Sequence, residues 1–379
     1  MKKIVFLTGT RADFGKLKSL IHTTQDNSNY EVHIFATGMH LNAKYGLTSD
    51  EIYNAGFRNI YPFVNHTIEE HMDRALAKTI EGFSDYIGEI KPDLIVVHGD
   101  RVEAMAGAIV GSLNNILVAH VEGGEISGTI DELIRHSISK LAHIHLVTNN
   151  KAKTLLLQLG ELENSIFIIG SPDLDLMNEE NLPALTEVKE YYEIGYKKYA
   201  VAMFHPVTTE YHDIKKTIKN FVDSLIESQL NYVVIYPNND LGSREILEEY
   251  TRIQDNPRIK IFPSLRFEYF LALLKNAEFM IGNSSAGIRE APHFQVPSID
   301  IGTRQNDRAC LNSIEHCDYD TKNILEAISK VLNRKVKIIN KNLEFGGGDS
   351  NIIFANILRK KEFWGISHQK QFQKIKTNE

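Results

Sequence analysis

Cysteine is scarce in this sequence, because Cys310 and Cys317 are the only two among 379 residues. They do not form a CxxC pair, so neither a redox motif nor a disulfide framework is predicted. Long apolar runs are also lacking, and no stretch reaches the roughly 18 apolar residues that a membrane-spanning helix needs. The apolar run at residues 4–7 is too short for a signal peptide, and Arg11 and Asp13 follow it closely. We therefore expect a soluble, cytoplasmic protein with no membrane partner.

Blocks of basic residues are lacking as well. The chain has 42 Lys and Arg against 49 Asp and Glu, which gives a net charge of −7. A charge of this sign without a basic cluster disfavours nucleic acids and anionic membranes as partners. The GxGxxG fingerprint of dinucleotide-binding proteins and the P-loop are both missing. We therefore expect no bound cofactor.

Histidine is common, with 15 residues, but its spacing does not predict a metal site. The segment HTIEEHM at 66–72 is similar to the HExxH zinc motif. However, His66 and His71 are five residues apart, so they do not share one face of a helix. His136, His143 and His145 also lack a standard ligand spacing. We predict that the protein holds no metal.

The sequence does contain a regular alternation of short apolar, β-branched runs with longer amphipathic stretches. The short runs lack a 3.6-residue period, which is typical of buried strands. They occur at residues 3–9, 31–38, 93–100 and 116–124, in HIHLVTN and IFIIGSP, and in the segments 199–206, 231–240, 259–264, 278–292 and 297–305. Strand–helix–strand alternation predicts parallel sheets in an α/β fold.

The length and the 42 % apolar fraction agree with two globular domains. A polar stretch at 173–195 interrupts the alternation and predicts the crossing between them. We predict two doubly wound, Rossmann-like domains that face a cleft, with residues 1–173 in the first and 174–352 in the second. The amphipathic tail at 353–379 predicts a closing helix.

Polar side chains follow nearly every predicted strand. In an open parallel sheet, ligands bind beyond the carboxyl ends of the strands. A single polar residue there is most often a solvated loop residue, but eight strand ends that all carry one indicate a shared cleft. These residues are Arg11, His40, Asp100, Arg101, Glu122 and Asp131 in the first half, and His205, Asn238, Ser284, Ser285, Glu290 and Arg304 in the second.

The segment GNSSAGIRE at 282–290 is the clearest candidate for binding an anion. Asn283, Ser284 and Ser285 are good N-cap residues, so we expect a helix to begin there. Free N–H groups and the helix dipole attract a diphosphate, and Glu290 is placed to accept hydrogen bonds from a ribose diol. A capped helix with an exposed glutamate explains the same residues equally well. Arg11 and Arg304 add positive charge suited to a diphosphate.

The segment HVEGGEISGTIDELIRHSISK at 120–140 concentrates acidic residues directly after an apolar strand. Glu122 ends that strand and Asp100 ends a neighbouring one. Asp131 begins a helix, where the dipole favours its charge, and Arg135 follows four residues later as a possible ion-pair partner. Paired carboxylates in a half-buried cleft are suited to removing and donating protons. The residues alone therefore indicate an α/β enzyme that acts on an anion similar to a nucleotide sugar.

At these same residues the sequence resembles the hydrolysing UDP-N-acetylglucosamine 2-epimerases of bacterial sialic acid biosynthesis. The motifs that carry the resemblance run in order from residue 8 to 305 and so cover most of the chain. They are TGTRADFGKL, TGMH, VVHGDR, HVEGGEISGTID, IRHSISKLAH, MFHPVTTE, YPNNDLGS, IGNSSAGIREAP and IGTRQ. The family has the two-domain glycosyltransferase-B architecture, in which the last helix crosses back to the first domain.

The resemblance implies that UDP-GlcNAc and water are converted to ManNAc and UDP, and it implies a role for each candidate residue. In the first domain Asp100, Glu122 and Asp131 are the catalytic acids, and His205 in the second domain is a further active-site group. The implied UDP ligands are Arg11, Asn238, Ser284, Ser285, Glu290 and Arg304, with His40 and Arg101 near the sugar or the phosphates. The family often has a second Asp where this chain has Glu132, and the segment ACLNS after Arg308 lacks an expected glycine.

Three other functions remain open from the sequence. A non-hydrolysing 2-epimerase shares the fold and most of the acids, but EGGEISGTID and MFHPVTTE are more similar to the hydrolysing branch. A hydrolysing epimerase for a 2,4-diacetamido-trideoxy sugar of legionaminic acid synthesis is the second. A UDP-sugar-binding protein or transferase is the third, and carboxylates at all three positions argue against it. A homo-oligomer, either a dimer or a tetramer, is the expected assembly.

Overall fold

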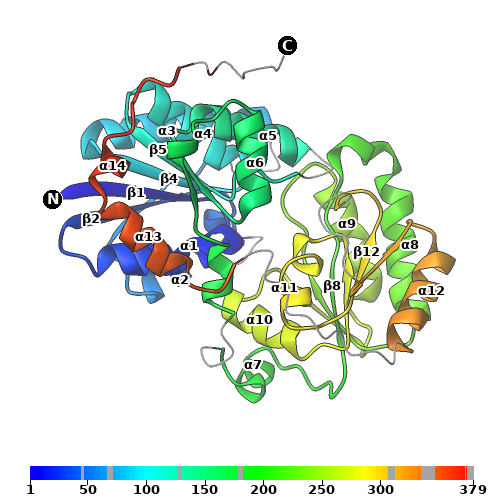
Figure 1. Cartoon of the computed structure of the whole chain (residues 1–379). Helices are drawn as coiled ribbons and strands as arrows, with labels where there is room; N and C mark the ends of the chain where they lie inside the picture. The colour runs from blue at the N-terminus through cyan, green and yellow to red at the C-terminus, as the bar shows by residue number, and fades with distance from the viewer. Residues whose placement is uncertain are drawn as a thin grey trace, which may run out of the picture. The chain divides into compact units, whose positions relative to one another are not determined.

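The computed structural model describes residues 1–43, 47–65, 71–126, 130–177, 182–305, 312–333, 346–371 and 373. His66 of the rejected zinc motif and Cys310 lie outside these residues. The chain divides into two compact units (Figure 1). Unit 1 comprises Met1–Glu125, Asp131–Glu179 and Leu343–Glu379, and unit 2 comprises Ile126–Ile130 and Glu180–Asn342.

Unit 1 is built on a parallel sheet that has seven strands among the described residues. The strands are β1 (Lys2–Thr8), β2 (Tyr30–Ala36), β3 (Asn59–Pro62), β4 (Leu94–His98), β5 (Leu117–Val121), β6 (Ile144–Val147) and β7 (Ile166–Ile168). Their order across the sheet is β3-β2-β1-β4-β5-β6-β7. Every residue of β4, β5 and β6 is buried, which explains why these strands read as continuous apolar runs.

The helices of unit 1 cover both faces of this sheet (Figure 1). They are α1 (Arg11–Gln25), α2 (Ser49–Asn54), α3 (Met72–Ile90), α4 (Val102–Leu113), α5 (Ile130–Leu141), α6 (Asn150–Gln158), α13 (Ser350–Leu358) and α14 (Lys361–Trp364). The Thr10 side chain caps α1 by accepting the Asp13 N–H at 3.1 Å. The C-terminal helix α13 packs beside α1, and Phe354 is fully buried in the core of unit 1.

Unit 2 holds a second parallel sheet, with six strands in the part of the chain that the structure describes. The strands are β8 (Ala200–Met203), β9 (Tyr232–Ile235), β10 (Ile259–Phe262), β11 (Met280–Gly282), β12 (Ser298–Ile301) and β13 (Ile314–Cys317), in the order β10-β9-β8-β11-β12-β13. The helices are α7 (Leu185–Tyr191), α8 (Ile214–Glu227), α9 (Ser243–Tyr250), α10 (Phe267–Lys275), α11 (Glu290–His293) and α12 (Thr321–Leu332).

Both sheets follow the doubly wound order, in which the chain reverses its direction of growth once. The reversal lies between β1 and β4 in unit 1, and between β8 and β11 in unit 2. Ligands of such sheets bind beside the carboxyl ends of the strands at this switch point. None of the described helices is both long enough and apolar enough to cross a bilayer.

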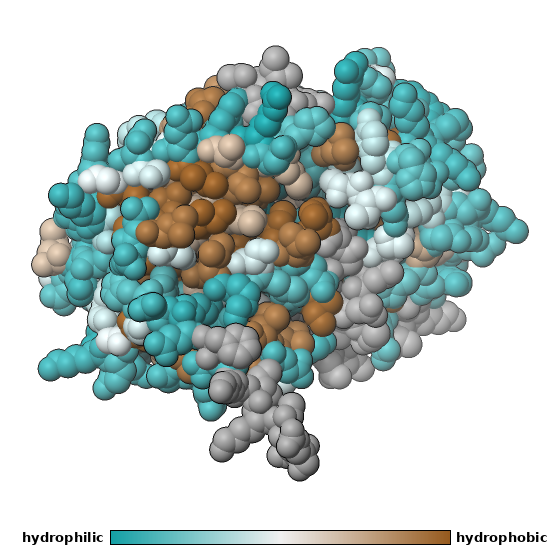
Figure 2. Space-filling view, turned by 90° about the horizontal axis from the view of Figure 1, so that it is seen from above, coloured by the Kyte–Doolittle hydropathy of each residue, from teal (hydrophilic) through white to brown (hydrophobic). Residues whose placement is uncertain are grey.

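Helices α4 and α5 of unit 1 each leave a large apolar side chain exposed to solvent, and the neighbouring α3 leaves Leu76 and Ile80 half-buried. Leu113 on α4 is 77 % exposed and Leu133 on α5 is 60 % exposed. The only charged residue of α4 is Glu103, which is 1 % exposed, so the outer face of this helix carries no charge. Figure 2 shows a broad hydrophobic area over unit 1, on the side where Figure 1 draws these three helices. We call Leu76, Ile80, Leu113 and Leu133 the apolar surface.

Candidate active site

Asp100 and Glu122 follow neighbouring strands of unit 1 at the carboxyl end of the sheet. Asp100 comes two residues after β4, and Glu122 comes directly after β5, which pairs with β4. Glu122 has a φ of +63°, in the left-handed region. That conformation costs a residue with a side chain roughly 1 kcal/mol, and such strain concentrates at functional sites. The orientation of the Glu122 side chain is therefore maintained by a backbone conformation that is itself unfavourable.

The Glu122 carboxylate is buried among polar partners. Its Oε2 lies 3.1 Å from Nε2 of His98 and 3.5 Å from Nζ of Lys16. The Ser171 hydroxyl donates a hydrogen bond to Oε1. Only 4 % of the Glu122 side chain is exposed. A carboxylate in such a place needs both ion pairs and hydrogen bonds, and this one has both.

His98 lies between two carboxylates, because its Nδ1 is 3.3 Å from Oδ1 of Asp13 while Nε2 faces Glu122. A carboxylate only accepts hydrogen bonds, so the ring bonds both partners fully when both nitrogens carry protons. Burial by itself lowers the pKa of His98, but the charge of Glu122 and the bond to Asp13 outweigh it and raise the pKa to about 9. Burial raises the pKa of Asp13, yet its bond to His98 leaves that pKa below the usual value.

Asp13, Lys16 and His98 were not among the predicted site residues. Lys16 also lies 3.4 Å from Oδ2 of Asp173, so it links two buried acids. The signal was present in the sequence, since all three of these residues lie within TGTRADFGKL and VVHGDR. The Asp13–His98 contact joins the segments that follow β1 and precede Asp100, and so spans the switch point.

Asp100 forms an ion pair with the buried Arg135 of α5. The sequence indicated that Arg135 could pair with Asp131, and the structure adds Asp100 as a direct partner. Burial lowers the pKa of Arg135, but the charges of Asp100, Glu125, Asp131 and Glu122 raise it above its usual value. Asp131 lies in the first turn of α5, where the helix dipole favours a negative charge. Arg135 is thus the cation that the acids of this region share.

The other predicted residues of unit 1 lie nearby and have partners of their own. Nη2 of Arg11 forms an ion pair with Glu51 at 2.5 Å, and Nε of Arg101 donates to Glu103 at 3.2 Å. His40 is fully buried, with Nε2 3.0 Å from the Thr8 hydroxyl and Nδ1 2.8 Å from the Thr48 hydroxyl.

Burial of the His40 ring lowers its pKa to about 4, so the ring is neutral at physiological pH. Because the ring is fully buried, a direct contact with a ligand requires neighbouring residues to move.

In unit 2 the candidate site is organised around Asn283, which is fully buried after β11. Its Oδ1 accepts the backbone N–H of His205 at 2.6 Å, and its Nδ2 donates to the His205 carbonyl at 2.8 Å. These bonds join the ends of β8 and β11 across the switch point of unit 2. Gly282 enables this approach, because a Cβ there would lie 2.0 Å from the Met203 carbonyl oxygen.

Asn238, after β9, completes this arrangement. Its backbone N–H donates to Nδ1 of His205 at 3.0 Å, so the neutral ring carries its proton on Nε2. The Asn238 side chain donates to Asp240. Arg304 and Gln305, after β12, both donate to the Asn283 carbonyl, at 3.3 Å and 2.9 Å.

The helix predicted to begin within residues 283–285 forms only as two short pieces. Ser284 does act as a cap, accepting the Ala286 N–H at 3.3 Å, but only a 3-10 turn follows, at Ser285–Gly287. A separate helix, α11, covers Glu290–His293. Pro292 explains the break, because it has no N–H to donate to the carbonyl four residues earlier. Glu290, at the start of α11, is 3 % exposed.

The predicted residues therefore lie at strand ends or helix starts of each unit: the three acids in unit 1, and His205 with the expected UDP ligands other than Arg11 in unit 2. Among the described residues no group of three or more His, Cys, Asp or Glu side chains is arranged to hold a metal ion.

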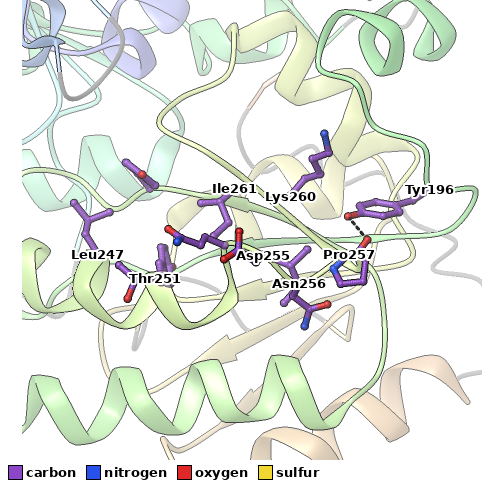
Figure 3. A pocket seen from close by; sticks show the side chains of 12 residues that line it. Tyr196, Leu247, Thr251, Asp255, Asn256, Pro257, Lys260 and Ile261 are labelled. Carbon is purple, nitrogen blue, oxygen red and sulfur yellow. Dashed lines mark hydrogen bonds between the residues drawn. The ribbon is translucent and has the colours of Figure 1, made fainter.

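Unit 2 also contains a pocket of about 450 Å³ beside the edge strand β10. Figure 3 shows Tyr196 at this pocket with its hydroxyl bonded to the Pro257 carbonyl, at 3.1 Å. None of the residues that line this pocket is a predicted site residue, although Tyr236 on its wall lies two positions before Asn238.

Comparison with known proteins adds independent findings. The model of the family described as UDP-N-acetylglucosamine 2-epimerase matches residues 22–359. A UDP-N-acetylglucosamine 2-epimerase of Neisseria meningitidis serogroup B is 49 % identical over 375 residues, which cover 98 % of this chain and 99 % of the relative. A UDP-N,N'-diacetylbacillosamine 2-epimerase (hydrolyzing) of Legionella pneumophila is 34 % identical over 353 residues, or 90 % of this chain and 92 % of the relative.

Among solved structures, the UDP-GlcNAc 2-epimerase of Methanocaldococcus jannaschii in complex with UDP-GlcNAc and UDP has a TM-score of 0.81 at 24 % identity. The match covers 94 % of this chain and 99 % of that one. The predicted fold class, two parallel-sheet α/β units of the glycosyltransferase-B type, is thereby confirmed.

Proposed function

The chain belongs to the UDP-N-acetylglucosamine 2-epimerase family, and we propose that it is the hydrolysing enzyme that converts UDP-GlcNAc and water to ManNAc and UDP. The product is the first intermediate of sialic acid synthesis for a bacterial capsule or similar surface polysaccharide. The proposal rests on the high identity to the Neisseria epimerase and on the hydrolysing activity in the printed name of the Legionella relative.

The proposed chemistry begins with breakage of the bond between C1 and the UDP oxygen. The positive charge that develops at C1 acidifies the C2 hydrogen, which is otherwise not next to a carbonyl. A carboxylate takes that proton, which leaves UDP and 2-acetamidoglucal. Water then adds its oxygen to C1, and a proton is delivered to C2 on the opposite face, giving ManNAc. The protein must stabilise the departing diphosphate and supply acid–base groups around the sugar.

The observation that carries the proposal is the group of carboxylates at the carboxyl ends of β4 and β5. One carboxylate cannot easily serve both faces of a sugar that is held in place, so inversion at C2 calls for at least two. Asp100, Glu122 and Asp131 belong to three different elements: Asp100 pairs directly with Arg135, and the charges of Glu122 and Asp131 also act on this guanidinium. The side chain of Asp100 is 26 % exposed, so it is open to a substrate, whereas Glu122 is buried and held by His98 and Lys16.

We further propose that the strand ends of unit 2 bind UDP. Arg304 supplies positive charge for the diphosphate, Ser284 and Ser285 supply hydroxyl and backbone donors, and Glu290 accepts from the ribose. Asn283 fixes His205 and Arg304 together, so the histidine imidazole is near the same ligand. On this proposal residues 1–173 carry the catalytic acids and 174–352 the nucleotide site.

The principal alternative is a hydrolysing epimerase for a UDP-2,4-diacetamido-trideoxy sugar, and the Legionella relative supports it. A non-hydrolysing epimerase, which returns UDP to the glycal, needs the same acids. A transferase or simple binding protein would not need carboxylates on three elements around one cation.

Product analysis tests the proposal and separates it from these alternatives. The protein is incubated with UDP-GlcNAc, and in parallel with the UDP-2,4-diacetamido-trideoxy sugar, and products are identified by NMR as they form. We expect free ManNAc and UDP in equal amounts from UDP-GlcNAc, formed at least about 100-fold more slowly by an Asp100→Asn variant. Accumulation of UDP-ManNAc would make the enzyme non-hydrolysing, and turnover of the diacetamido sugar alone would reassign the substrate.

We also propose that the protein forms a dimer through the apolar surface of α3, α4 and α5. At about 1.5 Å per residue, the 19 residues of α3 are about 28 Å long. The 12 residues of α4 and the 12 of α5 are each about 18 Å long, so the three helices, about 9 Å apart, cover roughly 580 Å². This is close to the roughly 600 Å² per partner at the small end of stable interfaces. The outer face of α4 has no charge, so it meets a second copy of itself without repulsion.

Light scattering on purified protein tests this assembly. We expect a dimer for the wild type and a monomer for Leu113→Glu, which places a charge at a position that is 77 % exposed. The matched control is Leu332→Glu in unit 2, where the side chain is 43 % exposed, and it should remain a dimer. A monomeric wild type would contradict the proposal.

A further inference from the structure

His120 is a buried histidine that the proposed chemistry does not use. It lies in β5, two residues before Glu122, and is 0 % exposed. Its Nε2 is 2.7 Å from the carbonyl oxygen of Gly99, and its Nδ1 is 3.0 Å from the hydroxyl of Ser139 on α5. Gly99 immediately precedes Asp100, so this one ring lies directly behind two of the proposed catalytic acids.

The partners of His120 fix which nitrogen carries the proton. A carbonyl oxygen only accepts hydrogen bonds, so Nε2 donates to Gly99. In the neutral ring Nδ1 then has no hydrogen and accepts from the Ser139 hydroxyl. Burial lowers the pKa of His120 to about 3, although the bond to Gly99 opposes this, and the nearby cations Arg135 and His98 lower it further. The ring is therefore neutral and held in a single tautomer.

The turn that follows Glu122 packs directly onto the same ring. A Cβ at Gly123 would lie 2.8 Å from Nδ1 of His120 and 2.8 Å from the Ser139 hydroxyl oxygen. Real Cβ atoms do not approach other atoms this closely, so only glycine fits. The backbone of Gly123 therefore rests against the His120–Ser139 pair.

The turn that carries Asp100 is held from both sides. The Gly99 N–H donates to the Val121 carbonyl at 3.0 Å, while the Gly99 carbonyl accepts from His120. Gly99 has a φ of +72°, which turns the chain sharply between His98 and Asp100. A small rotation of this turn would move the Asp100 carboxylate away from Arg135.

We propose that His120 is a positioning residue which, through Gly99 and Gly123, fixes the backbone of Asp100 and Glu122 relative to each other. Helix α5 takes part through Ser139, so the helix that carries Asp131 and Arg135 is held to the same ring. The proposal rests on the proposed function, since it assigns His120 to the acids of that reaction. Loss of a group that orients a reacting residue without touching the substrate commonly lowers activity by about 10- to 100-fold.

Kinetics of substituted proteins test the role. His120→Leu should lower kcat by about 10- to 100-fold and change KM by less than about threefold, because the acids lose alignment while the UDP site is untouched. His120→Gln should recover most of the activity, because its amide can still donate to the Gly99 carbonyl. The matched control is His145→Leu: His145 is the cross-strand partner of His120 on β6, is equally buried, and bonds Glu161 at 3.0 Å. It should lose stability but keep kcat.

Hydrogen exchange provides a readout that does not depend on activity. The reporters are the N–H of Gly99, bonded to Val121, and the N–H of Glu122, bonded to the Leu146 carbonyl at 2.9 Å. Both should lose protection together in His120→Leu by more than the loss of global stability measured by urea unfolding, and in His145→Leu by no more than that loss. If both stay protected, or if kcat is unchanged in His120→Leu, the positioning role is wrong. If the wild type makes no ManNAc, the proposed function fails, and the exchange of these two amides still decides the role of His120.

Discussion

Oε2 of Glu122 lies 3.1 Å from Nε2 of His98, and both side chains are buried at the ends of adjacent strands. The proposed catalytic acid is therefore held by a cation that comes from within the same sheet. A buried ion pair of this kind is costly to break, because removing one partner leaves an isolated charge. The pair thus links the stability of unit 1 to the protonation of its site.

The first prediction concerns the charge states of two buried histidines. His98, with a pKa of about 9, should remain protonated at pH 7, and His40, with a pKa of about 4, should remain neutral. Ring-carbon NMR shifts of labelled histidine, assigned by His98→Gln and His40→Gln variants, should stay constant for both residues between pH 5.5 and 7.5. Titration of the His98 signal near pH 6.5 would contradict the ion pair.

Stability should follow the same titration. Because the folded-state pKa of His98 is raised, its contribution is fully present below about pH 6.5 and disappears as the pH rises through 9. At 1.36 kcal/mol per pKa unit, the loss is at most about 3 kcal/mol. Urea unfolding of the wild type should weaken over this range, whereas His98→Gln, less stable at neutral pH, should show a flatter profile. If stability falls equally steeply with pH in the wild type and in His98→Gln, His98 is not the source of the pH dependence.

A second prediction concerns the three acids. Asp100→Asn, Glu122→Gln and Asp131→Asn should each lower turnover by at least about 100-fold, the usual scale for losing a positioned acid or base. UDP affinity should persist, because the proposed nucleotide site lies in unit 2. Glu132→Gln is the control: this neighbour on α5 lies 3.6 Å from His136 on the surface and should keep full turnover. If one of the three variants keeps wild-type turnover, the acid that it replaces has no role in the mechanism.

A third prediction concerns the nucleotide site. Arg304→Ala should weaken UDP by about tenfold or more, because hydrogen bonds to charged groups contribute roughly 1.5–3 kcal/mol. Glu290→Ala should weaken UDP through the ribose but leave the affinity for inorganic diphosphate unchanged. Arg252→Ala is the control, since Arg252 pairs with Asp223 and Glu249 on the surface of the same unit. UDP affinity is measured by calorimetry. If it is equal in all three variants, the proposed anion site is in the wrong place.

The sequence predicts those parts of the site that are local along the chain. Asp100, Glu122, His205 and Asn238 each follow an apolar run closely, so strand recognition places them at the carboxyl edge of a sheet. The alternation also predicts parallel sheets without any contact information.

Contacts between segments were harder to predict, because they depend on the strand order. Asp13 meets His98 only because β1 and β4 are neighbours, although 85 residues separate the two side chains in sequence. The ion pair between Arg135 and Asp100 likewise depends on where α5 lies relative to the end of β4. The break between the 3-10 turn at Ser285–Gly287 and α11 reflects Pro292, which the capping residues before it do not reveal.

A fourth prediction concerns the C-terminal helix. Phe354 on α13 is fully buried in the core of unit 1, so Phe354→Ala should cost about 3–5 kcal/mol in the free energy of unfolding. Ile352→Ala on the same helix removes a side chain that is 60 % exposed and should cost little. Tryptophan fluorescence from Trp364, which packs against the same core, reports unfolding of unit 1. Equal unfolding midpoints for the two variants would contradict the packing of α13.

The last prediction concerns the order of bond breaking. Elimination before hydration breaks the C1–O bond, removes the original C2 hydrogen and replaces it from solvent. Direct hydrolysis would also take its oxygen from water but would keep the C2 hydrogen. We therefore expect that a reaction in deuterated, oxygen-18 water gives ManNAc with deuterium at C2 and UDP without oxygen-18. The C1 oxygen must be measured at once, because the free sugar exchanges it through its open chain.

Unlabelled C2 in newly formed ManNAc would end the elimination mechanism unless the same proton returns without exchange. Detection of the intermediate resolves that case. If Asp131 helps to deliver the second proton, the Asp131→Asn variant should release 2-acetamidoglucal, because hydration slows while C1–O cleavage continues. Glu132→Gln, one position along α5, should release none. Deuterium at C2 together with free glycal requires that C1–O cleavage and C2 deprotonation precede hydration, and this is the order that carboxylates on β4, β5 and α5 are placed to catalyse.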